Sequence, residues 1–97
     1  MKVKSLKQVK EFARDIEGWL SNKEGRFLYR MAKNCTGKGV IVEIGSWKGK
    51  STCWLASGSK AGNNVPVYAI DPHAATSLHD ERKEVSTYPE FERNMQK

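Results

Sequence analysis

The stretch VIVEIGSWKGKST, residues 40–52, decides the fold of this chain. Its first part, residues 40–44, is a short run rich in β-branched residues that ends at Gly45. Such a run, bounded by glycines, is typical of a strand buried on both faces of a parallel sheet. The residues after Gly49 can form a helix that extends to about Lys60. The stretch therefore predicts a strand, a glycine loop and a helix in succession.

The residues that follow complete a βαβ unit. Gly62 is a natural end for the helix, and residues 65–70, VPVYAI, form a second apolar run that ends at Asp71. Pro66 must lie near the start of this strand, because proline cannot donate a hydrogen bond to a central ladder. Strand, loop, helix and strand make a Rossmann-like βαβ unit of about thirty residues, right-handed by the general rule.

Two amphipathic helices are expected before this unit. Ser5 and Gln8 fit a capping box that opens the first helix, and Gly18 is expected to end it. Ser21 and Glu24 fit a second capping box. Apolar residues recur at helical spacing and are expected in the core: Leu6, Val9, Phe12, Ala13 and Ile16 in the first helix, and Phe27, Leu28, Met31, Ala32 and Cys35 in the second.

The chain after the second strand is less regular. Residues 73–87 are polar and are expected to form a loop with at most one helical turn. Pro89 is well placed at the first position of a further helix, which carries Phe91 and Met95.

Length and charge limit the possible organisation and partners. At 97 residues the chain holds at most one small domain. Residues 1–38 are expected to be a helical lead-in, and residues 39–97 to be the βαβ unit and the following helix. The formal net charge of +6 could suit nucleic acid. Because basic and acidic residues are interleaved, a solvated basic surface is the preferred interpretation, and nucleic acid is not an expected partner.

The cysteines and histidines indicate neither a disulfide framework nor a metal site. Cys35 and Cys53 lie far apart and form no C-x-x-C pair, which favours free thiols and a cytoplasmic protein. His73 and His79 have no recognised metal-ligand spacing with the nearby aspartates, so no metal is expected. No stretch approaches the roughly eighteen apolar residues of a membrane span, so no membrane partner is expected.

Three features converge where the two strands end. Ligands of open parallel sheets bind outside the carboxyl ends of the strands. Gly45 and Gly49 allow a ligand to approach the backbone closely. Ser51 and Thr52 begin a helix whose free N–H groups point toward the same space. Asp71 lies 22 residues after Gly49, which is the spacing at which a carboxylate reaches the ribose hydroxyls of a nucleoside.

Glu43 predicts the charge of the ligand. The loop lacks the middle glycine of the dinucleotide fingerprint, because Trp47 stands in its place. A carboxylate two residues before Gly45 is a poor neighbour for a pyrophosphate and a good one for an ammonium or sulfonium group. The site is therefore expected to bind a nucleoside with a cationic tail, with Asp71 on the ribose and Glu43 near the positive end.

Each candidate residue also has a structural explanation. The glycines suit a plain strand-to-helix turn, and an Asp-Pro pair can open a turn. Lys48 or Lys50 could neutralise Glu43, and helix capping could account for the hydroxyl residues. Trp47 is expected to shield the loop or pack on a neighbour. The candidate cofactor-binding residues are Glu43, Gly45, Ser46, Trp47, Gly49, Ser51, Thr52, Asp71 and His73, the last by its position after Asp71.

These segments carry a family resemblance. Residues 40–56, VIVEIGSWKGKSTCWLA, followed by residues 67–73, VYAIDPH, resemble the first half of a class I S-adenosylmethionine-dependent methyltransferase. The E-x-G-x-x-x-G motif from Glu43 to Gly49 resembles the first motif of that family, and Asp71 resembles the acid that closes its second strand. The likeness extends over about residues 16–95 and includes the F-x-x-N pattern of Phe91 and Asn94. It implies S-adenosylmethionine as cofactor and an unknown methyl acceptor.

The resemblance also implies a larger fold. The expected class is α/β, with a Rossmann-like βαβ unit preceded by two helices, as an incomplete part of a seven-stranded methyltransferase sheet. Residues 1–97 would be the N-terminal portion of one methyltransferase domain, inactive alone and with an unknown catalytic base. Because two strands leave edges and apolar faces exposed, we expect the chain to associate with a copy of itself or with a partner.

Other functions remain open from the residues alone. A P-loop needs four residues between its first glycine and the Gly-Lys pair, and only three separate Gly45 from Gly49. A degenerate P-loop that binds a nucleotide phosphate through Lys50 and Ser51 is one alternative. A non-catalytic interaction remnant is another. A Ser-His-Asp hydrolase is not favoured, because GSWKG does not match the G-x-S-x-G elbow.

Overall fold

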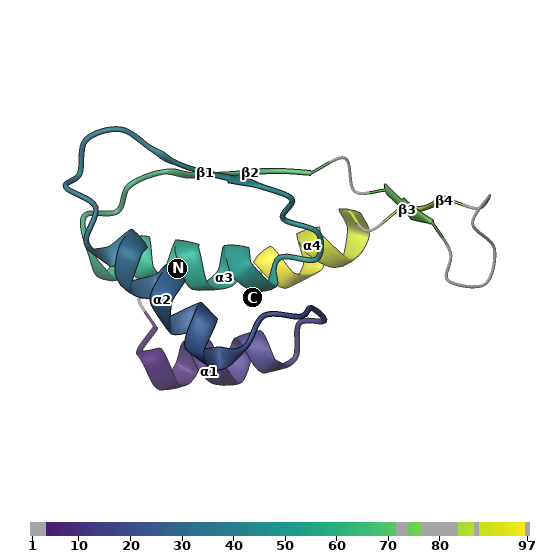
Figure 1. Ribbon diagram of the computed structural model, residues 1–97, viewed down its shortest axis with the longest axis horizontal. Coiled ribbons are helices and arrows are strands. Elements are labelled where there is room, and N and C mark those ends of the chain that lie inside the picture. Colours follow the sequence, from purple (N-terminus) through teal and green to yellow (C-terminus); the bar gives the residue numbers. More distant parts are fainter. Residues whose placement is uncertain (1–3, 72–73, 77–83, 87, 97) are drawn as a thin grey trace.

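The computed structural model describes residues 4–71, 74–76, 84–86 and 88–96. These residues form a mixed α/β structure, as expected, and Figure 1 shows the strand pair β1–β2 as one layer with the helix α3 beneath it and α1 below. The elements are α1 (Leu6–Arg14), α2 (Asn22–Lys33), β1 (Ile41–Ile44), α3 (Lys50–Ala61), β2 (Val67–Ile70), β3 (Ala74–Thr76), β4 (Glu84–Ser86) and α4 (Tyr88–Met95). No helix within these ranges is long and apolar enough to cross a membrane.

The strands β1 and β2 pair in parallel and are connected through α3, which confirms the βαβ unit. Ile41 lies opposite Val67, and Ile44 lies opposite Ile70. The pairing continues past the last strand residue, because the N–H of Gly45 donates to the carbonyl of Ile70 at 2.7 Å. Both strands therefore end side by side, at the edge where the sequence predicts the site.

Both predicted capping boxes are present. The Ser5 and Gln8 pair opens α1, and the Ser21 and Glu24 pair opens α2. The pKa of Glu24 is lowered, mainly by the hydrogen bond from the backbone of Ser21 and to a smaller extent by its hydroxyl. The predicted end of the first helix at Gly18 is wrong, because α1 stops at Arg14 and the chain leaves it through a tight turn.

The core lies where α2 and α3 cross, and glycines let these helices approach closely. A Cβ on Gly25 would overlap the indole ring of Trp54, and a Cβ on Gly58 would overlap the backbone carbonyl of Tyr29. Trp54 is consequently among the most completely buried side chains of the described residues. The buried cluster consists of Val9, Ala13, Ile16, Tyr29, Cys53 and Trp54.

The predicted core face of α2 is partly wrong. Phe27 and Met31 are exposed, whereas Ala32 is buried as predicted, and the other buried residues of α2 are Gly25 and Tyr29. The buried face of α2 differs from the predicted one because the indole ring of Trp54 packs directly against Gly25, where no side chain intervenes. Leu6, predicted as a core residue of α1, is also exposed.

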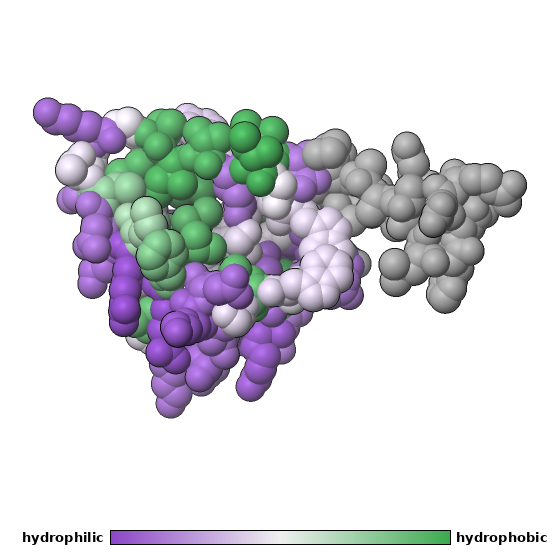
Figure 2. All heavy atoms as spheres, viewed as in Figure 1, coloured by the Kyte–Doolittle hydropathy of each residue, from purple (hydrophilic) through white to green (hydrophobic). Residues whose placement is uncertain are grey.

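The prediction that the first strand is buried on both faces is wrong as well. Burial alternates along β1 and β2, and only one face of the pair lies over α3. Ile44 on the other face is 84% exposed. Figure 2 shows this face as an apolar patch over the strand pair. Its exposed side chains belong to Val40, Val42, Ile44, Tyr68 and Ile70.

The segment predicted as a loop contains strands. Within its described residues, β3 pairs with β4 in antiparallel register, with Ala75 opposite Val85. The predicted helix that follows is confirmed as α4, with Pro89 in its first turn and Phe91 and Met95 half-buried.

Candidate functional site

The loop between β1 and α3 has an unusual backbone. Gly45, Trp47 and Gly49 all have positive φ angles, of +87°, +47° and +94°. This left-handed region suits glycine and is uncommon for other residues. A Cβ on Gly45 would have no atom within 4 Å, so the site is open beside this residue.

Gly49 has a different environment from Gly45. It is the N-cap of α3, and a Cβ there would lie 2.6 Å from Cε of Met95 and 3.2 Å from Cδ2 of Phe91. The side-chain amide of Asn94 also donates to the carbonyl of Lys48 at 2.9 Å. The space beside Gly49, where the sequence predicts the approach of a ligand, is therefore occupied by α4 through Met95 and Phe91.

Asp71 contacts the loop directly. The backbone N–H of Trp47 donates to Oδ2 of Asp71 at 2.8 Å. This bond connects the loop after β1 to the residue after β2, and the carboxyl group is partly buried. Asp71 therefore lies beside the glycine loop, as its spacing predicts.

Glu43 is held by the first turn of α3. Its two carboxylate oxygens accept hydrogen bonds from the hydroxyls of Ser51 and Thr52. The ion pair of Lys48 is formed with Glu17 instead, at 2.9 Å, and the stem of Lys50 lies against Gly18. Helix capping does not explain the hydroxyls either, because α3 has no side-chain cap.

Ser46 carries an unpaired polar atom. The residue is only 3% exposed, and its Oγ has no hydrogen-bond partner among the described residues. A buried hydroxyl without a partner costs roughly 1–3 kcal/mol. Such an atom beside an open loop is consistent with a group that binds there.

Trp47 packs on a neighbour, which is one of its two predicted roles. Its ring stacks on that of Trp19, with centroids 5.6 Å apart and planes 6° apart. The ammonium group of Lys48 lies 4.7 Å from the centroid of the Trp47 ring. Trp19 was not predicted as part of the site, and no motif or spacing in the sequence signals its contact.

Two other expectations concern residues or sites elsewhere. His73 lies outside the described residues. Across residues 4–71 and the shorter described segments, no group of three or more His, Cys, Asp or Glu residues could hold a metal ion.

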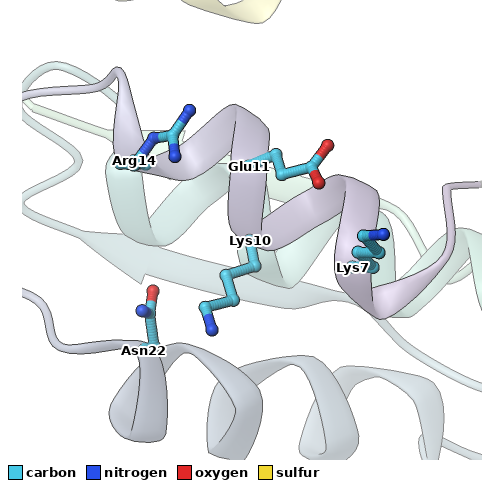
Figure 3. Close-up of a pocket in the computed structure, with 5 residues that line it drawn as sticks. All are labelled: Lys7, Lys10, Glu11, Arg14 and Asn22. Carbon is cyan, nitrogen blue, oxygen red and sulfur yellow. The ribbon is translucent and has the colours of Figure 1, made fainter.

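A separate cavity of about 250 Å³ lies between α1 and the start of α2 (Figure 3). Its lining is mainly basic and consists of Lys7, Lys10, Glu11, Arg14 and Asn22.

The site lies in a segment that is similar to a known family. A family model described as a methyltransferase domain matches residues 42–97, which is more than half of the chain. The match begins within β1 and includes the glycine loop, Asp71 and α4. It does not include α1, α2 or the segment that connects them.

Proposed function

Because this chain belongs to the methyltransferase domain family, we propose that its glycine loop binds S-adenosylmethionine for methyl transfer to an acceptor. The observation that carries the proposal is the position of Asp71, whose Oδ2 accepts a 2.8 Å hydrogen bond from the backbone N–H of Trp47 in the glycine loop. A carboxylate and an open glycine loop thus meet at the carboxyl ends of adjacent parallel strands, where nucleosides bind in open sheets.

Asp71 is the proposed ribose ligand. An ionised carboxylate offers about four acceptor positions on two oxygens. The hydrogen bond from Trp47 is therefore compatible with hydroxyl donors on the same group. The fixed position of the carboxylate would favour a vicinal diol over a single hydroxyl, because both oxygens belong to one planar group.

Ser46 and Gly45 are proposed to receive the amino-acid end of the cofactor. Gly45 leaves open space beside the loop, and the buried hydroxyl of Ser46 has no partner among the described residues. A hydrogen bond donated by this hydroxyl to a bound carboxylate, or accepted by it from a bound ammonium group, would satisfy it. His73, on the adenosine side, and Trp47 remain proposed contacts.

Glu43 has a more indirect proposed role than the sequence suggests. The hydrogen bonds that it accepts from Ser51 and Thr52 fix a carboxylate between β1 and the first turn of α3. Such a charge favours a ligand with an ammonium and a sulfonium group over one with phosphates. Ser51 and Thr52 would act by holding this carboxylate.

The cofactor supplies the reactive methyl group, and the protein supplies orientation and a site of low water content. The two carboxylates at the loop are both engaged in hydrogen bonds. The proposal assigns both carboxylates to cofactor binding and neither to proton removal from an acceptor, so we expect the 97-residue chain to bind the cofactor without measurable turnover. In this proposal residues 39–97 bind the cofactor and residues 1–38 support the loop from outside.

The exposed apolar face of β1 and β2 is the proposed surface for association with a second copy. Sedimentation at several concentrations tests this. A well-folded monomer at the highest concentration would count against it.

Calorimetric titration tests the binding proposal. S-adenosylmethionine should bind, Asp71→Asn should weaken binding about tenfold or more through the loss of charged hydrogen bonds, and Lys50→Ala should change it little. Binding of Mg-ATP that depends on Lys50 would support the degenerate P-loop instead. Binding of neither ligand by the folded chain would contradict the proposal.

A further inference from the structure

Trp47 has a backbone conformation that needs support. Its φ of +47° is uncommon for a residue with a bulky side chain. Such conformations are energetically unfavourable and persist only where the surroundings fix them. One support is the hydrogen bond from the Trp47 backbone to Asp71, the residue after β2.

The other supports come from the segment between α1 and α2. The ring of Trp19 stacks on Trp47 in nearly parallel planes. Glu17 pairs with Lys48, whose ammonium group also lies over the Trp47 ring. Residues 17–19 therefore contact the loop at two consecutive positions, and they lie outside the family match at residues 42–97.

The exposure of Trp19 indicates what this contact does. The residue is 94% exposed, so it contributes little to the hydrophobic core. Its defined neighbour is the ring of Trp47. Stacked aromatic pairs are stabilising, and here that contribution, limited by the small area that the exposed Trp19 ring buries, acts on the conformation of the glycine loop.

We infer that Trp19 is a positioning residue for the cofactor loop, holding Trp47 in its left-handed conformation through the ring stack. Glu17 assists through its ion pair with Lys48, whose ammonium group also lies over the Trp47 ring. The part of this inference that concerns the cofactor rests on the proposed function. The part that concerns the loop does not.

Amide hydrogen exchange of the full chain measures the opening of the loop directly. Without Trp19, the open form should become about two- to threefold more populated, from the lower end of the strength of an aromatic pair, because the stack buries little area. Exchange at the Trp47 amide should therefore accelerate by that factor in Trp19→Ala. The amide of Tyr29, in the buried centre of α2, should change less than about twofold.

Three further variants separate stacking from general destabilisation. Trp19→Phe keeps an aromatic ring and should restore most of the protection at Trp47. Phe27→Ala removes another exposed aromatic side chain, on α2, and should leave Trp47 exchange unchanged. Glu17→Gln should have a smaller effect than Trp19→Ala, because exposed ion pairs contribute little.

The inference is overturned if Trp19→Ala leaves Trp47 exchange unchanged, or if exchange at Tyr29 accelerates equally. It is also overturned if Trp19→Phe behaves like Trp19→Ala. Titration of the same variants with S-adenosylmethionine tests the cofactor part: weaker binding by Trp19→Ala supports it, and unchanged affinity overturns it. Absence of binding by the wild-type chain would contradict the proposed function, while the exchange data still decide the role of Trp19 in the loop.

Discussion

The backbone N–H of Trp47 and the carboxylate of Asp71 are joined by a 2.8 Å hydrogen bond across the ends of two parallel strands. This bond makes the glycine loop and the end of β2 one structural unit. A charge-assisted bond of this kind contributes more than one between neutral groups. The candidate cofactor site is therefore held together by groups of the protein itself.

Alanine substitutions at the two loop glycines should differ in whether cofactor affinity or thermal stability falls more. Gly45→Ala puts a methyl group into the open space of the site and forces a disfavoured φ. Cofactor affinity should fall more than stability does. Gly49→Ala forces the same kind of disfavoured φ, and in addition its methyl group must displace Cε of Met95 and press on the ring of Phe91, so thermal stability should fall more. Adding Met95→Ala to Gly49→Ala should recover part of that stability, and no recovery would contradict the packing explanation.

Glu43 and Ser51 should be energetically coupled. Glu43→Gln removes the charge that strengthens this hydrogen bond, and Ser51→Ala removes the hydroxyl that donates it. A double-mutant cycle in urea should give a coupling energy of about 0.5–3 kcal/mol. A cycle of Glu43→Gln with Arg26→Ala, an exposed residue on α2, should give none. Equal coupling in both cycles would contradict a specific contact.

Gly25→Ala should destabilise the chain although alanine is the better helix former. Helix propensity favours alanine by about 1 kcal/mol, but the added methyl overlaps the Trp54 ring. Overpacking of this kind costs about 1–3 kcal/mol. Urea unfolding should show a net loss, and Trp54→Phe in the Gly25→Ala background should reduce it. Lys23→Ala, on the exposed surface of α2, is the matched control and should not show this loss. A Gly25→Ala chain that is more stable than the wild type would contradict this account of the core.

The positions of these residues show how far the sequence could predict the structure. The glycine loop, its flanking strands and Asp71 could be predicted because β-branched runs, glycines and fixed spacings are local signals. The core face of α2 could not, because the choice between Phe27 and Tyr29 depends on a contact with α3. Trp19 could not be assigned to the site either, since its stack joins distant segments without any periodic pattern.

Cys53 should make stability decrease at alkaline pH. Burial raises the pKa of this thiol from 9.0 to about 11, although Lys4 and a hydrogen bond to Ser57 lower it in part. The folded state therefore retains the proton that the unfolded state loses. The stabilising effect is full below pH 9.0 and is lost as the pH rises through about 11. Urea unfolding should show this loss relative to Cys53→Ala; parallel pH curves for the two chains would contradict it.

The most direct test of the central claim is an amide NMR titration of the chain with S-adenosylmethionine. The account predicts shifts at Gly45, Ser46 and Trp47 and at Asp71, with little change in the distant α1 cavity around Lys10. Parallel addition of Mg-ATP should leave these amides unchanged. A folded chain whose loop amides do not respond to S-adenosylmethionine, or respond only to Mg-ATP around Lys50, would contradict the claim that this loop is a methyltransferase cofactor site.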